Sequence, residues 1–210
     1  ILEILTDKVN MEVEAETSRF RAGGRTAVTG RFTLTPVRDE ERGDVTEITL
    51  QSQPEIPKIA SHDVSLKVKN PVPINRKVRR LGLWVKGNSC WGRVFFEFTD
   101  ANGEQYRSST RYWDRRKLAH TAAIAHDGWR FIAQELPGVP LEGEDGGTAL
   151  VQAAKRRDWS SRGGDGDGKV QFPITLTRVA VAMREWQVYV TDMVPATSRS
   201  IRLGDLVAGD

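Results

Sequence analysis

The stretch LGLWVKGNSCWGRVFFEFTDANG, residues 81–103, decides how the rest of the sequence is interpreted. Apolar and polar side chains alternate on both sides of the glycine-containing segment 87–89, and period-two alternation is typical of β-strands. Asn102-Gly103 follows, a pair that favours a tight turn because both residues accept a left-handed backbone. We therefore expect an aromatic hairpin at the centre of a sheet, with a second turn at 100–103. Its inward positions are Leu81, Leu83, Val85, Val94, Phe96 and Phe98.

Short alternating segments of the same kind occur along the whole chain and are bounded by glycine, proline or charged turns. One of these turns, residues 38–44 (RDEERGD), has the composition of a charged hairpin tip. Strands without a regular strand–helix alternation predict an all-β, jelly-roll-like β-sandwich, and residues 1–210 are expected to form a single domain. One or two short helices are expected in loops, near residues 118–124 and 147–158. The expected strands lie within 11–16, 28–34, 45–50, 64–68, 128–132, 174–183, 188–190 and 201–206.

Composition places the chain among globular proteins and limits its partners. The chain has 31 Lys and Arg residues and 28 Asp and Glu residues, which gives a formal charge of +3. Such a small excess of positive charge does not indicate nucleic-acid binding. No apolar stretch approaches the roughly 20 residues that a spanning helix needs, and no membrane partner is expected. Cys90 is the only cysteine, which excludes an internal disulfide and predicts a structural thiol. Because the chain opens with Ile1, we expect it to be a piece of a longer protein.

The order of five segments resembles the galactose-binding-like jelly rolls that serve as carbohydrate-binding modules. These segments are 81–87, 93–103, 127–130, 172–181 and 188–192, and the resemblance covers about residues 78–194. It implies an ancillary domain of a secreted polysaccharide-processing protein, extracellular or periplasmic, with a covalently attached catalytic domain and a polysaccharide or oligosaccharide ligand. It also implies that Trp84 and Trp129 pack between the sheets, and we assign both to the core.

Aromatic and basic residues outside those strands are the candidates for ligand binding. The indole of Trp91, after the predicted turn, could stack on a pyranose ring, or could pack under a loop. The run Arg111–Lys117 places Tyr112 and Trp113 among four cations, which suits an acidic polysaccharide. The same run would suit single-stranded nucleic acid, or could be a solvated loop. The predicted carbohydrate contacts are Trp91, Arg93, Arg111, Tyr112, Trp113 and Arg115.

The resemblance also implies a structural calcium ion, held by an acidic residue of the first strands and an aspartate after the last long strand. Asp192 has the second position, and Glu14 or Glu16 could supply the first. An aspartate after a strand also commonly just begins a turn. Residues 165–168 (DGDG) resemble the start of an EF-hand loop, but Lys169 stands at the third ligand position and the closing glutamate is missing. We therefore exclude an EF-hand.

Catalytic motifs are not found in the sequence. Its three histidines, His62, His120 and His126, form no zinc pattern, and neither a nucleophile elbow, a Walker A loop nor a dinucleotide fingerprint occurs. The sequence thus predicts a non-catalytic module that binds a plant, algal or microbial polysaccharide by aromatic stacking and arginine contacts. The alternatives are a structural β-sandwich domain without its own ligand and a polysaccharide lyase or hydrolase, with nucleic-acid binding more remote.

Overall fold

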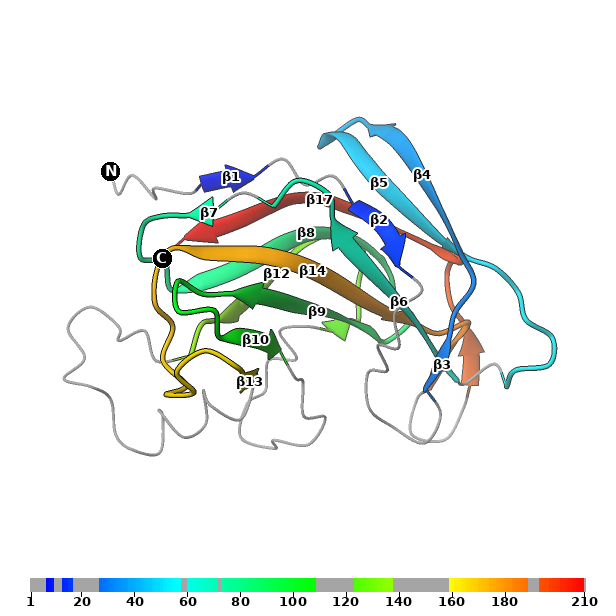
Figure 1. The fold of residues 1–210 in the computed structure, drawn as a ribbon. Coiled ribbons are helices and arrows are strands. Elements are labelled where there is room, and N and C mark those ends of the chain that lie inside the picture. The colour runs from blue at the N-terminus through cyan, green and yellow to red at the C-terminus, as the bar shows by residue number, and fades with distance from the viewer. Residues whose placement is uncertain are drawn as a thin grey trace.

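The structure, a computed structural model, describes residues 7–9, 13–16, 27–57, 60–71, 73–108, 123–137, 159–188 and 193–209. These residues form two large antiparallel sheets and a small two-stranded one. Figure 1 shows one large sheet, with β9, β10 and β14, in front of β8 and β12 of the other. The predicted all-β, jelly-roll-like β-sandwich is therefore confirmed. No helix in the described part of the chain is long and apolar enough to span a membrane.

Sheet A has five strands in one continuous order. They are β12 (Asp127–Glu135), β8 (Arg80–Asn88), β17 (Ser200–Gly209), β5 (Gly43–Leu50) and β4 (Phe32–Asp39), and β1 (Asp7–Val9) adds to β17. The β4–β5 hairpin contains the charged tip that the sequence predicted, and it projects from the body of the sandwich (Figure 1). Its position at one edge of sheet A lets its tip reach the outer face of that sheet.

Sheet B contains the strands of the other layer. Its continuous order is β13 (Trp159–Arg162), β10 (Gln105–Ser108), β9 (Gly92–Thr99), β14 (Ile174–Met183), β6 (Ser61–Val68) and β2 (Val13–Glu16). Three short strands add to it: β11 (Ala123–Ile124) beside β9, β3 (Ala27–Thr29) beside β6, and β7 (Pro73–Ile74) beside β14. A separate hairpin joins β15 (Trp186–Val188) and β16 (Met193–Pro195).

The helices expected in loops are not seen among the described residues. Ala123 and Ile124, at the end of the predicted helix 118–124, form β11 against β9, so the prediction is wrong for these two residues. Their ladder with a central strand outweighs the helical preference of an alanine-rich segment. The remainder of that helix and the one expected at 147–158 lie outside the described residues.

The decisive stretch forms two strands, but they do not pair as a hairpin. β8 pairs with β12 and β17 in sheet A, whereas β9 pairs with β10, β11 and β14 in sheet B. The chain crosses from one sheet to the other at residues 89–91, so the apolar positions of β8 and β9 both point into the interior. The hairpin prediction is wrong because alternation shows which face of a strand is buried, not which strand lies beside it. Both strands are central in their sheets, as predicted.

The crossing point has an unusual backbone that is fixed by hydrogen bonds. Ser89 and Trp91 have φ of 52° and 54°, a region that side chains other than glycine seldom adopt. The Ser89 amide donates to the carbonyl of His126 (2.9 Å), and the Trp91 amide donates to that of Ile124 (3.1 Å). Between them the side chain of Cys90 is fully buried, as expected of a structural thiol.

Large aromatic side chains fill one end of the core. Phe98 is fully buried and stacks on Tyr106, with ring centroids 4.9 Å apart, while Trp159 meets it edge-on at 5.2 Å. The indole nitrogen of Trp159 donates to the carbonyl of Glu135, 2.7 Å away, which ties β13 of sheet B to β12 of sheet A. Phe96 and Phe98 of β9 thus pack in the interior of the sandwich, as the sequence predicted.

Candidate functional site

The outer face of sheet A carries three aromatic side chains that do not belong to the core. Trp84 on β8 and Phe131 on β12 are register partners, and their ring centroids lie 5.4 Å apart at 46°. Trp129 lies two residues from Phe131, on the same face and opposite Lys86. Phe131 is 36% exposed, and both tryptophans are half-buried. We call Trp84, Trp129 and Phe131 the aromatic face.

The position of these rings corrects the assignment of Trp84 and Trp129 to the core. The buried positions of the two strands are occupied by their neighbours, Leu83 and Val85 on β8 and Ile132 on β12. Successive side chains of a strand point to opposite faces, so both tryptophans point away from the interior. The size and apolarity of an indole favoured a core assignment. The alternation of side chains along the strand, however, determines which face of the sheet the indole lies on.

Two glycines let the rings lie close to the sheet. A Cβ atom on Gly82 would lie 2.2 Å from Cζ of Phe131, so this ring covers the place where a side chain would stand. A Cβ on Gly204 would lie 3.3 Å from Cβ of Trp84 and 3.4 Å from Cζ3 of Trp129. The aromatic face is therefore a low platform of rings on a sheet surface that lacks side chains beneath it.

The tip of the β4–β5 hairpin places a cation against this platform. The guanidinium carbon of Arg42 lies 3.5 Å from the ring centroid of Trp84 and 6.0 Å from that of Trp129. Such cation–π contacts are worth about 0.5–2 kcal/mol, more as they are desolvated. In the part of the chain that the structure describes, no carboxylate pairs with Arg42. Arg42 therefore keeps hydrogen-bond donors for a ligand.

Asp39, at the same tip, joins three strands of sheet A and is nearly fully buried. Its Oδ1 accepts a hydrogen bond from the indole Nε1 of Trp129 (3.0 Å). Its Oδ2 accepts from Nζ of Lys86 (3.0 Å) and from an Nη atom of Arg202 (2.7 Å). This carboxylate holds the tip onto the sheet and orients the Trp129 ring through the hydrogen bond to its indole nitrogen.

The same network fixes the charges around the platform. Burial by itself raises the pKa of Asp39, but the hydrogen bonds from Lys86, the Glu41 amide, Arg202 and Trp129 outweigh it and hold the pKa well below its usual range. Arg202 also donates from Nε to Glu47, 2.9 Å away. Both carboxylates are thus engaged by cations of the chain itself, whereas Arg42 has no carboxylate partner among the described residues.

The outer face of sheet B differs from this arrangement. Phe95, Ala180 and Ala182 point outward yet are 5%, 2% and 2% exposed, so the face is closed to solvent at this point. Beside them Arg178 donates to Glu97 at 2.6 Å. Phe95, Ala180 and Ala182 therefore offer no open surface to a sugar ring, whereas Phe131 on the aromatic face of sheet A is 36% exposed.

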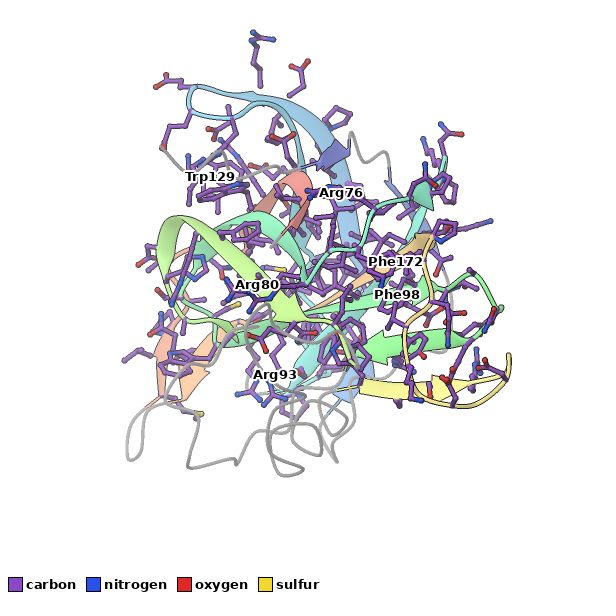
Figure 2. The ribbon with its side chains drawn as sticks, turned by 90° about the vertical axis from the view of Figure 1, so that its left-hand side faces the viewer. Arg76, Arg80, Arg93, Phe98, Trp129 and Phe172 are labelled. Atoms are coloured by element: carbon purple, nitrogen blue, oxygen red, sulfur yellow. The ribbon has the colours of Figure 1, made fainter. Side chains whose placement is uncertain are left out.

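Of the carbohydrate contacts predicted from the sequence, the structure describes Trp91 and Arg93. Trp91 is half-buried at the crossing point, and Arg93 is half-buried on β9 of sheet B. Arg93 and Trp129 are well separated in Figure 2. The other predicted contacts, Arg111, Tyr112, Trp113 and Arg115, lie outside the described residues.

Two further sets of residues complete the comparison with the sequence. Of the predicted calcium ligands, Glu14 and Glu16 lie in β2, of which the structure describes only the backbone, and Asp192 lies outside the described residues.

Sequence reasoning missed Asp39 and Arg42, which were treated only as a charged turn. Long-range contacts of a hairpin tip leave no local signal in the sequence. In contrast, the alternation of residues along β8, which places Trp84 and Lys86 on one face, can be recognised in the sequence.

Comparison with known proteins finds similar chains among solved structures. No family model matches the sequence, and no curated protein matches it significantly. Among solved structures, the chain is similar to the family 11 carbohydrate-binding module of the cellulosomal cellulase Lic26A-Cel5E of Clostridium thermocellum. The match covers 99% of this chain and 94% of that chain, at 10% sequence identity and a TM-score of 0.44.

Proposed function

We propose that this protein is a non-catalytic carbohydrate-binding module and that the aromatic face of sheet A binds the glycan. The observation that carries the proposal is the open platform of Trp84, Trp129 and Phe131 with Arg42 and Lys86 at its side. The apolar side of a pyranose ring stacks on an aromatic ring and leaves its hydroxyl groups directed at polar neighbours. The platform supplies both kinds of contact within one sheet face.

Within the platform, each group has a distinct role. Phe131, the most exposed ring, provides the stacking surface, and Trp84, whose ring lies 5.4 Å from it and is covered by Arg42, supports it from the side. Lys86 and Arg202, with side chains 35% and 31% exposed, present donors beside the rings while remaining tied to Asp39. Donors that are already fixed lose little freedom on binding, which favours affinity.

Charge favours a neutral or acidic polysaccharide as the ligand. The carboxylates Asp39 and Glu47 beside the platform are paired with Lys86 and Arg202, whereas no ion pair of Arg42 is seen among the described residues. The planar guanidinium of Arg42 suits a uronic acid carboxylate, which accepts two parallel hydrogen bonds from it. The wider setting proposed here is a secreted protein in which this module accompanies a covalently attached catalytic domain.

Two parts of the sequence prediction remain separate proposals. The basic and aromatic run that contains Arg111, Tyr112, Trp113 and Arg115, with Trp91 and Arg93, could form a second contact region. A calcium ion at Asp192 with Glu14 or Glu16 would tie the first strands to the last ones.

Affinity electrophoresis tests the proposed function directly. The protein is run through gels that contain neutral polysaccharides (β-glucan, xylan, mannan) or acidic ones (polygalacturonate, alginate). We expect the protein to be retarded in at least one gel. The Phe131→Ala variant should lose this retardation, and the control variant Met193→Ala should still be retarded. Met193 is 53% exposed in the separate β15–β16 hairpin.

A Trp113→Ala variant in the same gels separates the two proposed contact regions. Loss of retardation in Trp113→Ala but not in Phe131→Ala would move the site to the basic run. Migration unchanged in every gel would reject the carbohydrate-binding function and favour a structural domain.

A further inference from the structure

Three carboxylates converge beside the turn between β9 and β10, in the layer opposite the aromatic face. Glu104, Asp165 and Asp167 each offer an oxygen within 4.8 Å of the others. Glu104 follows the predicted Asn-Gly turn, whereas the aspartates belong to the glycine-rich loop between β13 and β14. In the described part of the chain, no lysine, arginine or histidine forms an ion pair with any of the three.

Glu104 is the member of this cluster that needs explanation, because its side chain is 0% exposed. Its Oε2 accepts a hydrogen bond from the Tyr106 hydroxyl, 2.9 Å away, but its Oε1 is buried and has no hydrogen-bond partner. A buried carboxylate oxygen without a donor is costly unless a cation compensates it.

The glycine-rich loop packs closely against the backbone of Glu104. A Cβ atom on Gly164 would lie 2.6 Å from the amide nitrogen of Glu104, so only a glycine permits such close approach. The side-chain amide of Asn102 donates to Asp165 (2.7 Å), and that of Gln171 donates to Asp167 (3.3 Å). These neutral donors orient the two exposed carboxylates without cancelling their charge.

We propose that Glu104, Asp165 and Asp167 bind a calcium ion, with Oε1 of Glu104 as the buried ligand. All the donors are oxygens, which excludes a site typical of zinc. Gln171 adds an amide Oε1 that is likewise buried without a partner. Exposed aspartates leave room for water ligands, and this irregular mixture suits the flexible coordination of calcium better than the strict octahedron of magnesium.

The position next to aromatic rings supplies a spectroscopic test. Tyr106 is hydrogen-bonded to a proposed ligand, and Tyr106, Trp159 and Asp167 line one pocket of about 180 Å³. Terbium, which replaces calcium at oxygen sites, luminesces when a nearby tyrosine or tryptophan is excited. We expect saturable terbium luminescence that calcium displaces, with a calcium Kd of about 10⁻⁴–10⁻³ M, and at least tenfold weaker displacement by magnesium.

Variants locate the ion within the chain. The double variant Asp165→Asn, Asp167→Asn removes two charges from exposed positions, and Glu104→Gln removes the buried charge while keeping its shape. We expect at least tenfold weaker calcium binding in each. Asp44→Asn is the matched control, because the Asp44 side chain is 86% exposed and distant in sequence.

Asp192→Asn tests the other calcium position. Unchanged binding in the double variant, or loss of binding in Asp192→Asn alone, would overturn the assignment to Glu104. No saturable luminescence and no calcium-dependent rise in melting temperature at 10 mM (roughly ten times the weakest Kd above) would overturn the site altogether. Because no glycan is present in these titrations, their result is independent of the proposed carbohydrate binding.

Discussion

Gly92, the first residue of β9, offers a direct test of the crossing between the sheets. A Cβ atom at this position would lie 2.0 Å from the carbonyl oxygen of Ala182 and 3.1 Å from Sγ of Cys90. Ordinary contact begins at 3.4 Å, so β9 and β14 would have to separate by more than 1 Å at the centre of sheet B. Overpacking of this kind costs about 1–3 kcal/mol, and each ladder hydrogen bond that is weakened adds about 1 kcal/mol.

Gly92→Ala should therefore lower the free energy of unfolding by about 3–4 kcal/mol, and the melting temperature by about 10 °C for a chain of this length. Urea unfolding followed by tryptophan fluorescence measures the change, and the m-value should stay constant. Gly103→Ala is the control: Gly103 has φ of 78° with open space around it, so only backbone strain of about 1–2 kcal/mol is expected. A Gly92→Ala variant that loses less than Gly103→Ala would refute the crossing and favour a β8–β9 hairpin.

Three further predictions concern the core and the charged network. Asp39→Asn should reduce the loss of stability in acid. The folded-state pKa of Asp39 lies below 3.8, so its stabilising contribution is present above about pH 4 and disappears as the pH falls further. Parallel acid-unfolding curves for the two proteins would contradict this. Phe98→Ala should cost about 3–5 kcal/mol in urea unfolding, because the ring is fully buried between two others; a cost below about 1 kcal/mol would show that the site is not core. Burial raises the pKa of the Cys90 thiol, so a disulfide reagent should modify it quickly only after denaturation, and fast reaction of the folded protein would place it at the surface.

Strand positions and buried faces could be predicted from alternation, whereas strand pairing could not. Leu83 and Phe96 were assigned correctly to inward faces, since parity within one strand is a local property. The pairing of β8 with β12 and β17 depends on residues up to about 130 positions away, as for Arg80 and Gly209, and no local pattern encodes it. The crossing depends on the left-handed backbone of Ser89 and Trp91. Because neither position is a glycine, the sequence does not indicate this conformation.

For the candidate site, the sequence indicated the kind of residue but not its place. Tryptophan and arginine were expected to bind a sugar together, and Trp84 with Arg42 has this pairing in the structure. These two residues come from different elements, 42 positions apart, that meet only because the β4–β5 tip folds over sheet A. The acidic cluster shows the same limit, since Glu104 joins Asp165 and Asp167 across about 60 residues.

Calorimetric titration of Phe131→Ala with the polysaccharide that retards the parent protein tests the central claim most directly. The loss of one stacking ring corresponds to about 1.5–3 kcal/mol of binding free energy, so the Kd should rise by about 10–100-fold. The Met193→Ala control should bind as the parent does, and circular dichroism should show that both variants remain folded. An unchanged Kd in Phe131→Ala would contradict the assignment of glycan binding to the aromatic face.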